Sequence, residues 1–410
     1  MRTLLLYILF ATSISVAAQE ANYEESKVGT LKLPEILVMD NGARVASSKD
    51  WENIRRGEIL KQFEKHVYGR IPGKPMQMQF DVVEKGSALN GKATRIQARI
   101  YFDKAARVSP ITVLMYLPEG KKEVPVFVGL NFNGNHTVHA DPNVLITDRY
   151  KPLHPDDSSP ERGGSASRWA VEELIANGFG VVTAWYEDLE ADHKDGYKTG
   201  IRTTLARDLN IKAEEWAALA VWGWGLHRIV DFLETIPEID HSRIALIGHS
   251  RLGKAALWAA ANDNRFALIV SNNSGEGGAA LSKRNFGETV ERINTQFPHW
   301  FVDKYKSYNG DVARLPVDQH MLLALIAPRP LYVASATEDL WADPKGEFLS
   351  AFHAGEAYGL FGKKGLGTDV QPGPDKSVGN SVRYHVRTGK HDVTLADWQF
   401  YIAFAKEMFR

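Results

Sequence analysis

Residues 241–261 constrain the fold of this chain more than any other segment. Residues 244–247 are an apolar run typical of a buried parallel strand, and Gly248-His249-Ser250 follows it. Residues 254–261 (KAALWAAA) are strong helix formers. A strand, a sharp turn around a serine and a helix expose the serine hydroxyl above the sheet, beside the positive end of the helix. We therefore predict that Ser250 is a nucleophile rather than an ordinary turn serine, although Gly253 comes one residue later than in the usual G-x-S-x-G motif.

Apolar runs typical of buried strands recur along the chain, with helical segments between them. The runs span residues 124–130, 179–184, 244–247, 266–271, 331–336 and 382–386. The helical segments span residues 51–68, 167–177, 214–234, 254–261, 348–358 and 394–409. This alternation predicts a mostly parallel central sheet with helices on both faces. Residues 94–117 alternate apolar and polar side chains, which adds an antiparallel N-terminal edge. The predicted class is α/β, with an α/β-hydrolase fold over one domain, residues 19–410.

The first 18 residues have the features of a secretory signal peptide. Met1-Arg2 supplies positive charge, residues 4–16 are largely apolar, and the small residues Val16-Ala17-Ala18 come last. The apolar run is shorter than the roughly 20 residues that span a bilayer, so we favour a cleaved signal over a membrane anchor. We expect cleavage after Ala18 and export of the rest of the chain, to the periplasm or the medium, without a membrane attachment.

Charge and cysteine content exclude several classes of function. Lys and Arg number 49 and Asp and Glu number 50, so the chain has no basic footprint for nucleic acid. The chain has no cysteine, which excludes disulfides, thiolate nucleophiles and cysteine-bound metals. No histidines have H-E-x-x-H spacing, and no glycine-rich segment has the sequence of a phosphate-binding loop. We expect no metal, no cofactor, no nucleic-acid partner and a monomeric state.

A serine nucleophile needs a base and a group that orients the base. In an α/β-hydrolase fold the acid and then the histidine follow the serine along the chain, each in a loop beyond a strand. His391 lies in the last such loop, between the strand at 382–386 and the final helix, and we assign it as the general base. His385 lies inside that strand and is expected to be structural, and His249 is expected to shape the pocket.

The acid has several candidates. Carboxylates beyond predicted strand ends are Glu276, Glu338, Asp339, Asp343 and Asp392. The loop after residues 331–336 is the usual place for this acid, and we assign Asp339, the first residue of its D-L-W-A-D-P segment. Glu338 and Glu276 remain alternatives, and any of these carboxylates also suits helix capping or substrate binding.

Other segments beyond strand ends suit binding or access. Residues 131–136 (NFNGNH) are placed for a second oxyanion donor, or are a simple turn. Residues 137–166 are long enough for a lid. Residues 185–198 (WYEDLEADHKDGYK) are acidic and aromatic, and we expect a solvated loop rather than the wall of a site. Residues 281–309 are an insertion that carries Glu288, Gln296, His299 and Trp300.

Two stretches resemble the signature of a known family. They are Gly248-His249-Ser250-Arg251-Leu252-Gly253-Lys254 and Ser271-Asn272-Asn273-Ser274-Gly275, and they are similar to those of glucuronoyl esterases, carbohydrate esterase family 15. The histidine before the serine resembles the bacterial form. The resemblance covers roughly residues 50–410. It implies a serine esterase of the 4-O-methyl-glucuronoyl methylesterase type, whose substrate is the ester between (4-O-methyl-)glucuronic acid of glucuronoxylan and a lignin alcohol.

The resemblance also implies roles in the reaction. Ser250 takes the place of the nucleophile and His391 that of the base, while the backbone N–H and the side chain of Arg251 stabilise the oxyanion. Many family members carry the acid just after the strand that follows the nucleophile helix. That position here is Asn273, which cannot ionise, and this difference favours Asp339, where some bacterial members have their carboxylate.

Four further residues match positions that hold the uronoyl sugar in the family: Lys254, Glu288, Gln296 and Trp341. Their chemistry suits a sugar, because Lys, Glu and Gln bind hydroxyls and Trp provides an apolar platform. The alternatives are a first-turn helix residue for Lys254, surface groups for Glu288 and Gln296, and a core side chain for Trp341.

Two other functions fit parts of the sequence. An acetyl-xylan or feruloyl esterase would keep the serine, histidine and acid without the sugar-binding set. A catalytically inactive carbohydrate-binding homologue is a more remote alternative, because Ser250, Arg251 and His391 are all present.

Overall fold

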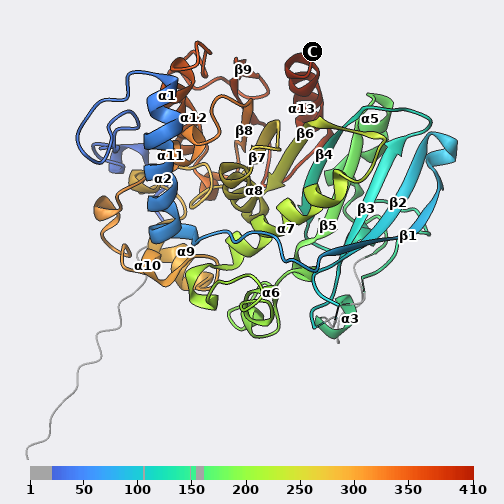
Figure 1. Cartoon of the computed structure of the whole chain (residues 1–410). Helices are drawn as coiled ribbons and strands as arrows, with labels where there is room; N and C mark the ends of the chain where they lie inside the picture. Colours follow the sequence, from blue (N-terminus) through green and yellow to red (C-terminus); the bar gives the residue numbers. More distant parts are fainter. Residues whose placement is uncertain (1–20, 105–106, 148, 154–160) are drawn as a thin grey trace, which may run out of the picture.

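A ten-stranded mixed sheet is the centre of the computed structural model, which describes residues 21–104, 107–147, 149–153 and 161–410 (Figure 1). The predicted signal peptide and part of the predicted lid lie outside these residues. The strands are β1 Gln79–Ala88, β2 Ala93–Tyr101, β3 Ile111–Pro118, β4 Val124–Asn131, β5 Gly180–Trp185, β6 Ile239–His249, β7 Leu268–Asn272, β8 Leu331–Ala336, β9 Val378–Gly379 and β10 Val382–Arg387.

The strand order is β1-β2-β3-β5-β4-β6-β7-β8-β10-β9. From β5 to β10 the neighbouring strands are parallel, with β6 in the middle of this part. From β1 to β5 they are antiparallel, as the alternating segment at 94–117 predicts. A short antiparallel strand, β9, closes the opposite edge, and the sequence did not indicate it. The predicted α/β sheet with an antiparallel N-terminal edge is confirmed.

Helices cover both faces of this sheet. They are α1 Ser48–Asp50, α2 Arg56–Phe63, α3 Tyr150–Leu153, α4 Ala166–Trp169, α5 Val171–Ala176, α6 Ile201–Thr204, α7 Ala218–Leu233, α8 Arg251–Asn262, α9 Val290–Gln296, α10 Asp303–Lys306, α11 Gln319–Ala324, α12 Pro344–Gly359 and α13 Leu395–Met408. Two short π-helical segments, Trp51–Arg55 and Glu64–Tyr68, flank α2. In the described part of the chain, no helix is long and apolar enough to cross a membrane.

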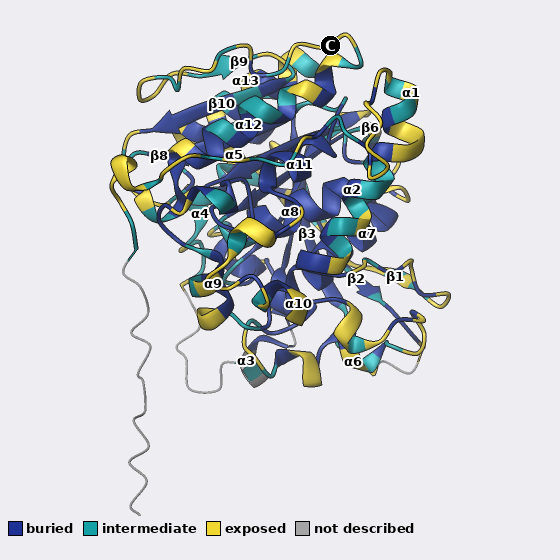
Figure 2. Ribbon diagram, turned by 90° about the vertical axis from the view of Figure 1, so that its left-hand side faces the viewer, coloured by how far each residue is buried: buried dark blue, intermediate teal, exposed yellow. Residues whose placement is uncertain are grey.

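Successive side chains of the central strands enter two separate cores. In β4, Val126 and Val128 join the core under α2, α7, α8, α11 and α12, while Phe127 joins the core under α5 and α13. This division follows from the alternation of side chains along a strand that is covered on both faces. Figure 2 shows the central strands and α8 as buried, with exposed residues mainly on the outer helices and loops.

Two predicted helices differ from the observed ones. The helix expected over residues 214–234 begins at Ala218, because Trp216 is extended and pairs with Gly69 through a β-bridge. The helix expected over 167–177 is split into α4 and α5 at Ala170, which has a φ of 40°. Neither change moves a predicted strand.

The loops beyond the carboxyl ends of the parallel strands gather at one end of the molecule. The chain after β4 leads to α3 and the chain after β5 leads to α6. Figures 1 and 2 show these helices at the same end as α9 and α10. In open α/β sheets this end is where ligands bind.

Candidate active site

Ser250 lies in the predicted sharp turn between β6 and α8. Its φ is 56° and its ψ is −131°, a strained conformation for a residue other than glycine. The turn closes because two glycines allow the backbone to approach itself: a Cβ at Gly248 would lie 2.2 Å from the Leu252 carbonyl oxygen, and one at Gly253 would lie 3.0 Å from the Gly248 oxygen. The late position of the second glycine therefore still gives the tight turn, and Ser250 stands at the N-terminus of α8.

His391 and Asp339 form a hydrogen-bonded pair from the loops after β10 and β8. The distance from His391 Nδ1 to Asp339 Oδ2 is 2.6 Å, and Asn273 Nδ2 donates to the same oxygen at 2.8 Å. Burial alone raises the pKa of Asp339, but the hydrogen bonds from His391 and Asn273 outweigh it and hold the pKa below its usual value. A carboxylate only accepts, so Nδ1 carries the proton and Nε2 of neutral His391 has a free lone pair.

The other histidines near this pair have different surroundings. The His249 ring lies 4.5 Å from the His391 ring, which brings His391 to the residue next to Ser250. His249 Nδ1 pairs with Asn272 Oδ1 at 2.6 Å, and burial lowers the pKa of His249 to about 3. His385 is completely buried inside β10, which agrees with the predicted structural role.

Among the described residues, the alternative acids make no hydrogen bond to His391. Glu276 is buried and accepts hydrogen bonds from Tyr305 at 2.6 Å and Ser282 at 2.8 Å, and Glu338 is exposed. Asp392 accepts from Arg168 Nε at 2.6 Å. Of the carboxylates considered, Asp339 is the one that the structure brings to His391.

Glu347 of α12 is a buried carboxylate that no motif in the sequence indicates. Its Oε1 accepts the backbone N–H of Ser274 at 2.8 Å and of Gly275 at 3.0 Å, and its Oε2 accepts the Ser335 hydroxyl at 2.6 Å. Burial raises the pKa of Glu347 to about 8. These bonds hold the loop that presents Asn273 to Asp339.

The first half of the acidic segment 185–198 is not the solvated loop that we predicted, whereas His193, Lys194, Tyr197 and Lys198 in its second half are exposed as expected. Glu187, Asp188 and Glu190 are buried, and the Asp192 side chain is only 4% exposed. The carboxylate of Asp192 forms an ion pair with Arg251, the residue that follows Ser250. The prediction failed because the cation lies 59 positions away and local charge density does not reveal it. The aromatic residues within the segment were the available signal that it packs inside.

The four predicted sugar-binding residues divide into buried and solvent-facing members. Lys254 is buried: its Nζ donates to the carbonyls of Ser274 at 2.5 Å and Glu276 at 2.6 Å. Glu288 lies 4.0 Å from that Nζ and is also buried, and burial raises its pKa. The backbone N–H of Glu288 donates to the Trp341 carbonyl at 2.9 Å. Trp341 is half-buried, and Gln296 is exposed at the end of α9.

The loop at 131–136 lies against the turn that carries Ser250. The Phe132 ring is 6.1 Å from the ring of His249 and 5.8 Å from the guanidinium carbon of Arg251. The Phe132 carbonyl accepts from Trp185 Nε1 at 3.0 Å, which ties the loop to β5. Its use as an oxyanion donor stays a prediction.

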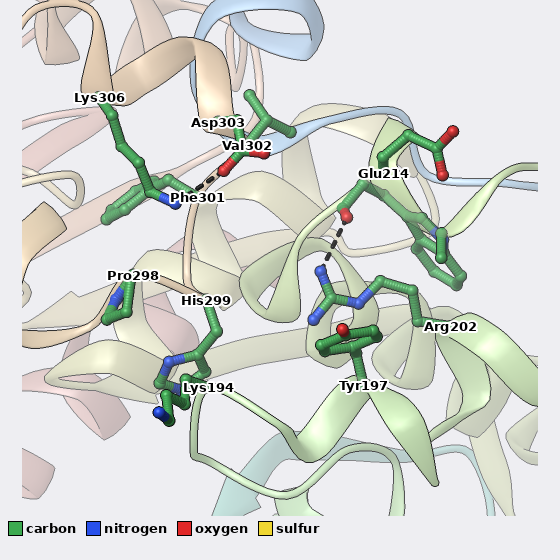
Figure 3. A pocket seen from close by; sticks show the side chains of 12 residues that line it. Lys194, Tyr197, Arg202, Glu214, Pro298, His299, Phe301, Val302, Asp303 and Lys306 are labelled. Atoms are coloured by element: carbon green, nitrogen blue, oxygen red, sulfur yellow. Dashed lines mark hydrogen bonds and ion pairs between the residues drawn. The ribbon is translucent and has the colours of Figure 1, made fainter.

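His299 connects this region to a neighbouring cavity. The cavity has a volume of about 380 Å³. Figure 3 shows His299, Tyr197 and Arg202 among the side chains around it. His299 Nε2 lies 2.8 Å from Asp192 Oδ1, so the Asp192 carboxylate links Arg251 to a residue that lines the cavity. Within the described ranges, no group of three or more His, Cys, Asp or Glu side chains has an arrangement that would hold a metal ion.

Several known proteins are similar to this chain in sequence and in fold. A family model of fungal glucuronyl esterases matches residues 172–362. Carbohydrate esterase MZ0003, from an unknown prokaryotic organism, is 44% identical over 98% of this chain and 98% of its own length. A glucuronoyl esterase structure from Solibacter usitatus is 44% identical, with a TM-score of 0.86 over 94% of this chain and 100% of that chain.

A third relative is a promiscuous family 15 esterase from a marine bacterial metagenome. It is 44% identical, with a TM-score of 0.88 over 95% of this chain and 100% of that one. The similarity in sequence and in fold therefore extends over almost the whole chain. This chain belongs to the glucuronoyl esterases, carbohydrate esterase family 15.

Proposed function

We propose that this protein is a serine esterase that cleaves the ester between (4-O-methyl-)glucuronic acid of glucuronoxylan and a lignin alcohol. The observation that carries the proposal is the His391–Asp339 pair, held at the strained Ser250 turn of a chain that is 44% identical to glucuronoyl esterases. The substrate carboxyl and alcohol are those that the family name and the sequence signature imply. The enzyme is proposed to act after export and removal of residues 1–18, as a monomer.

The proposed reaction begins at Ser250. His391 Nε2 takes the proton of the Ser250 hydroxyl as its oxygen attacks the uronoyl carbonyl carbon. The charge that develops on the carbonyl oxygen is stabilised by the Arg251 side chain and backbone N–H and by the N-terminus of α8. His391 then returns the proton to the departing alcohol, which leaves a glucuronoyl ester on Ser250. Water, deprotonated by His391, hydrolyses that ester and restores the serine.

The uronoyl group is proposed to bind between the buried and the solvent-facing members of the sugar-binding set. Lys254 and Glu288 supply a donor and an acceptor at the bottom, and Trp341 and Gln296 lie closer to solvent. Lys254 also holds two backbone carbonyls, so its replacement is expected to disturb the loop at Ser274 as well as the sugar.

Hydrolysis of benzyl glucuronate, benzyl galacturonate and p-nitrophenyl acetate tests the proposal. We expect strong turnover of the glucuronate that exceeds that of the other two esters, and none in Ser250→Ala. Activity confined to the acetate would contradict the proposed substrate and favour an acetyl esterase. Full activity of Ser250→Ala would contradict the proposed nucleophile, and failure of the wild type to react with a fluorophosphonate would favour an inactive homologue.

A further inference from the structure

Four side chains donate to the one carboxylate of Asp192. Its Oδ1 accepts from His299 Nε2 at 2.8 Å and from Trp300 Nε1 at 2.7 Å. Its Oδ2 accepts from the Tyr186 hydroxyl at 3.0 Å and pairs with Arg251 Nη1. Three donors besides Arg251 thus fix the position of the Asp192 carboxylate. A carboxylate held in this way has little freedom to rotate or move.

The Arg251 guanidinium is confined by aromatic rings as well as by Asp192. Its central carbon lies 4.9 Å from the ring of Trp300, 5.6 Å from that of Phe297 and 5.8 Å from that of Phe132. Asp192 engages Nη1, while the buried Nε has no hydrogen-bond partner among the described residues. The Arg251 side chain as a whole is 30% exposed, so part of it remains open to a ligand.

Asp192 remains charged over the whole range in which an esterase works. Burial alone raises the pKa of its carboxyl, but His299, Arg251 and Trp300 outweigh burial and lower the pKa to about 2. Near neutral pH, Asp192 therefore provides a constant negative charge at a fixed position. Such a group suits the orientation of a neighbouring cation better than proton transfer.

We propose that Asp192 is a positioning residue for the esterase reaction: it anchors one side of the Arg251 guanidinium so that the remaining N–H donors stay directed at the developing oxyanion. This inference rests on the proposed function, in which Arg251 stabilises that oxyanion. Charge that develops only in the transition state is stabilised best by donors that need no reorganisation, so the benefit of Asp192 falls on kcat rather than on KM.

Asp192→Asn tests the proposal, because it removes the charge and keeps the shape. We expect kcat for benzyl glucuronate to fall about 10- to 100-fold, as for a misplaced catalytic group, with KM changed by less than about threefold. In an Arg251→Ala background, Asp192→Asn should cost almost nothing further, since the group it orients is gone. Tyr186→Phe removes only one bond to the carboxylate, and a loss of a few-fold in kcat is expected.

Asp231→Asn is the matched control. Asp231 pairs with Arg228 at 2.6 Å in an equally buried position on α7, away from Ser250. We expect it to lower thermal stability and leave kcat per folded molecule unchanged. If Asp192→Asn behaved like this control, or if its loss of kcat were undiminished in the Arg251→Ala background, Asp192 would have only a structural role.

Fluorophosphonate labelling of Ser250 separates this inference from the substrate assignment. The reagent reacts with an activated serine whatever ester the enzyme prefers. A wild type that labels but does not turn over uronate esters would contradict the proposed substrate, while a slower labelling rate of Asp192→Asn would still support the positioning role. Equal labelling rates of wild type and Asp192→Asn would overturn the positioning role even if uronate esters are the substrate.

Discussion

His385 lies inside β10 and His391 lies six residues later in the loop that follows β10, and each is hydrogen-bonded to an aspartate. Both ring nitrogens of His385 are engaged, Nε2 by Asp397 at 2.9 Å and Nδ1 by the Tyr332 hydroxyl at 3.0 Å. The His391 side chain is 41% exposed, and its Nδ1 pairs with Asp339 at 2.6 Å. Among the described residues its Nε2 has no hydrogen-bond partner.

The difference between the two pairs shows what turns a histidine–aspartate pair into a candidate base. The carboxylate orients the ring in both cases. His385 has no ring nitrogen left for a substrate and no exposure to solvent. His391 has a ring nitrogen without a partner, is exposed to solvent, and lies beside His249, the residue that precedes Ser250. The two histidines differ in having a ring nitrogen without a hydrogen-bond partner and in their access to solvent, not in the pair with aspartate itself.

His391→Ala is expected to have the largest effect on turnover. Loss of the base should lower kcat by about 10⁴- to 10⁶-fold, because the serine then has no group to take its proton. The side chain is partly exposed, so the unfolding temperature should change by only a few degrees. Steady-state hydrolysis of benzyl glucuronate and calorimetry check both values, and residual turnover above one hundredth of wild type would contradict the assignment.

His385→Ala is expected to show the opposite pattern. It opens a cavity in a fully buried place and removes one hydrogen bond each from Asp397 and Tyr332, so we expect a loss of about 2–5 kcal/mol in the free energy of unfolding. Turnover per folded molecule should stay within about twofold. Chemical denaturation and active-site titration provide these numbers, and a selective loss of kcat would break the distinction between the two histidines.

Asn273→Asp is expected to have a smaller effect on the catalytic pair. A second carboxylate beside Asp339 Oδ2 replaces a hydrogen-bond donor with a like charge, which raises the pKa of the two carboxyl groups. The acidic limb of the kcat/KM profile should therefore move to higher pH, with a few-fold loss at pH 7. A profile identical to that of wild type would show that Asn273 has no electrostatic influence on His391.

The buried His385–Asp397 pair predicts a small effect of acid pH on the stability of the fold. Burial alone raises the pKa of Asp397, but His385 and Arg387 outweigh it, so the folded pKa lies below the unfolded value of about 3.9. A lowered pKa contributes stability that is present above the unfolded value and lost as the pH falls through the folded one. The difference in stability between wild type and Asp397→Asn should thus narrow below about pH 4, as urea unfolding at pH 7 and pH 3 can show. A constant difference would contradict this.

Much of the candidate site could be predicted because its signals are local. The apolar strand, the Gly248–Gly253 turn and the alanine-rich helix are contiguous, so they specify Ser250. His391 and Asp339 were predictable from the order of loops in the fold. The choice of Asp339 as the predicted acid also has a local signal, since Asn273 cannot ionise, and in the structure the Asn273 amide donates to Asp339.

The other features of the site and of the fold depend on tertiary contacts that sequence patterns do not indicate. Asp192 stands in an acidic segment, and only tertiary packing shows that Arg251, His299 and Trp300 bury it. The late start of α7 has the same origin, because the bridge between Trp216 and Gly69 keeps that tryptophan extended. Propensity and charge density are local quantities, and they miss an ion pair or a bridge formed across the fold.

The rate of fluorophosphonate labelling tests the central claim most directly, measured by mass spectrometry of the peptide that contains Ser250. Wild type, Asp339→Asn and His385→Ala are compared under conditions in which all three are folded. We predict labelling at Ser250, at equal rates in wild type and His385→Ala, and at least about 100-fold slower in Asp339→Asn. Labelling of another serine, or an Asp339→Asn protein that reacts as fast as wild type, would contradict a nucleophile activated by the His391–Asp339 pair.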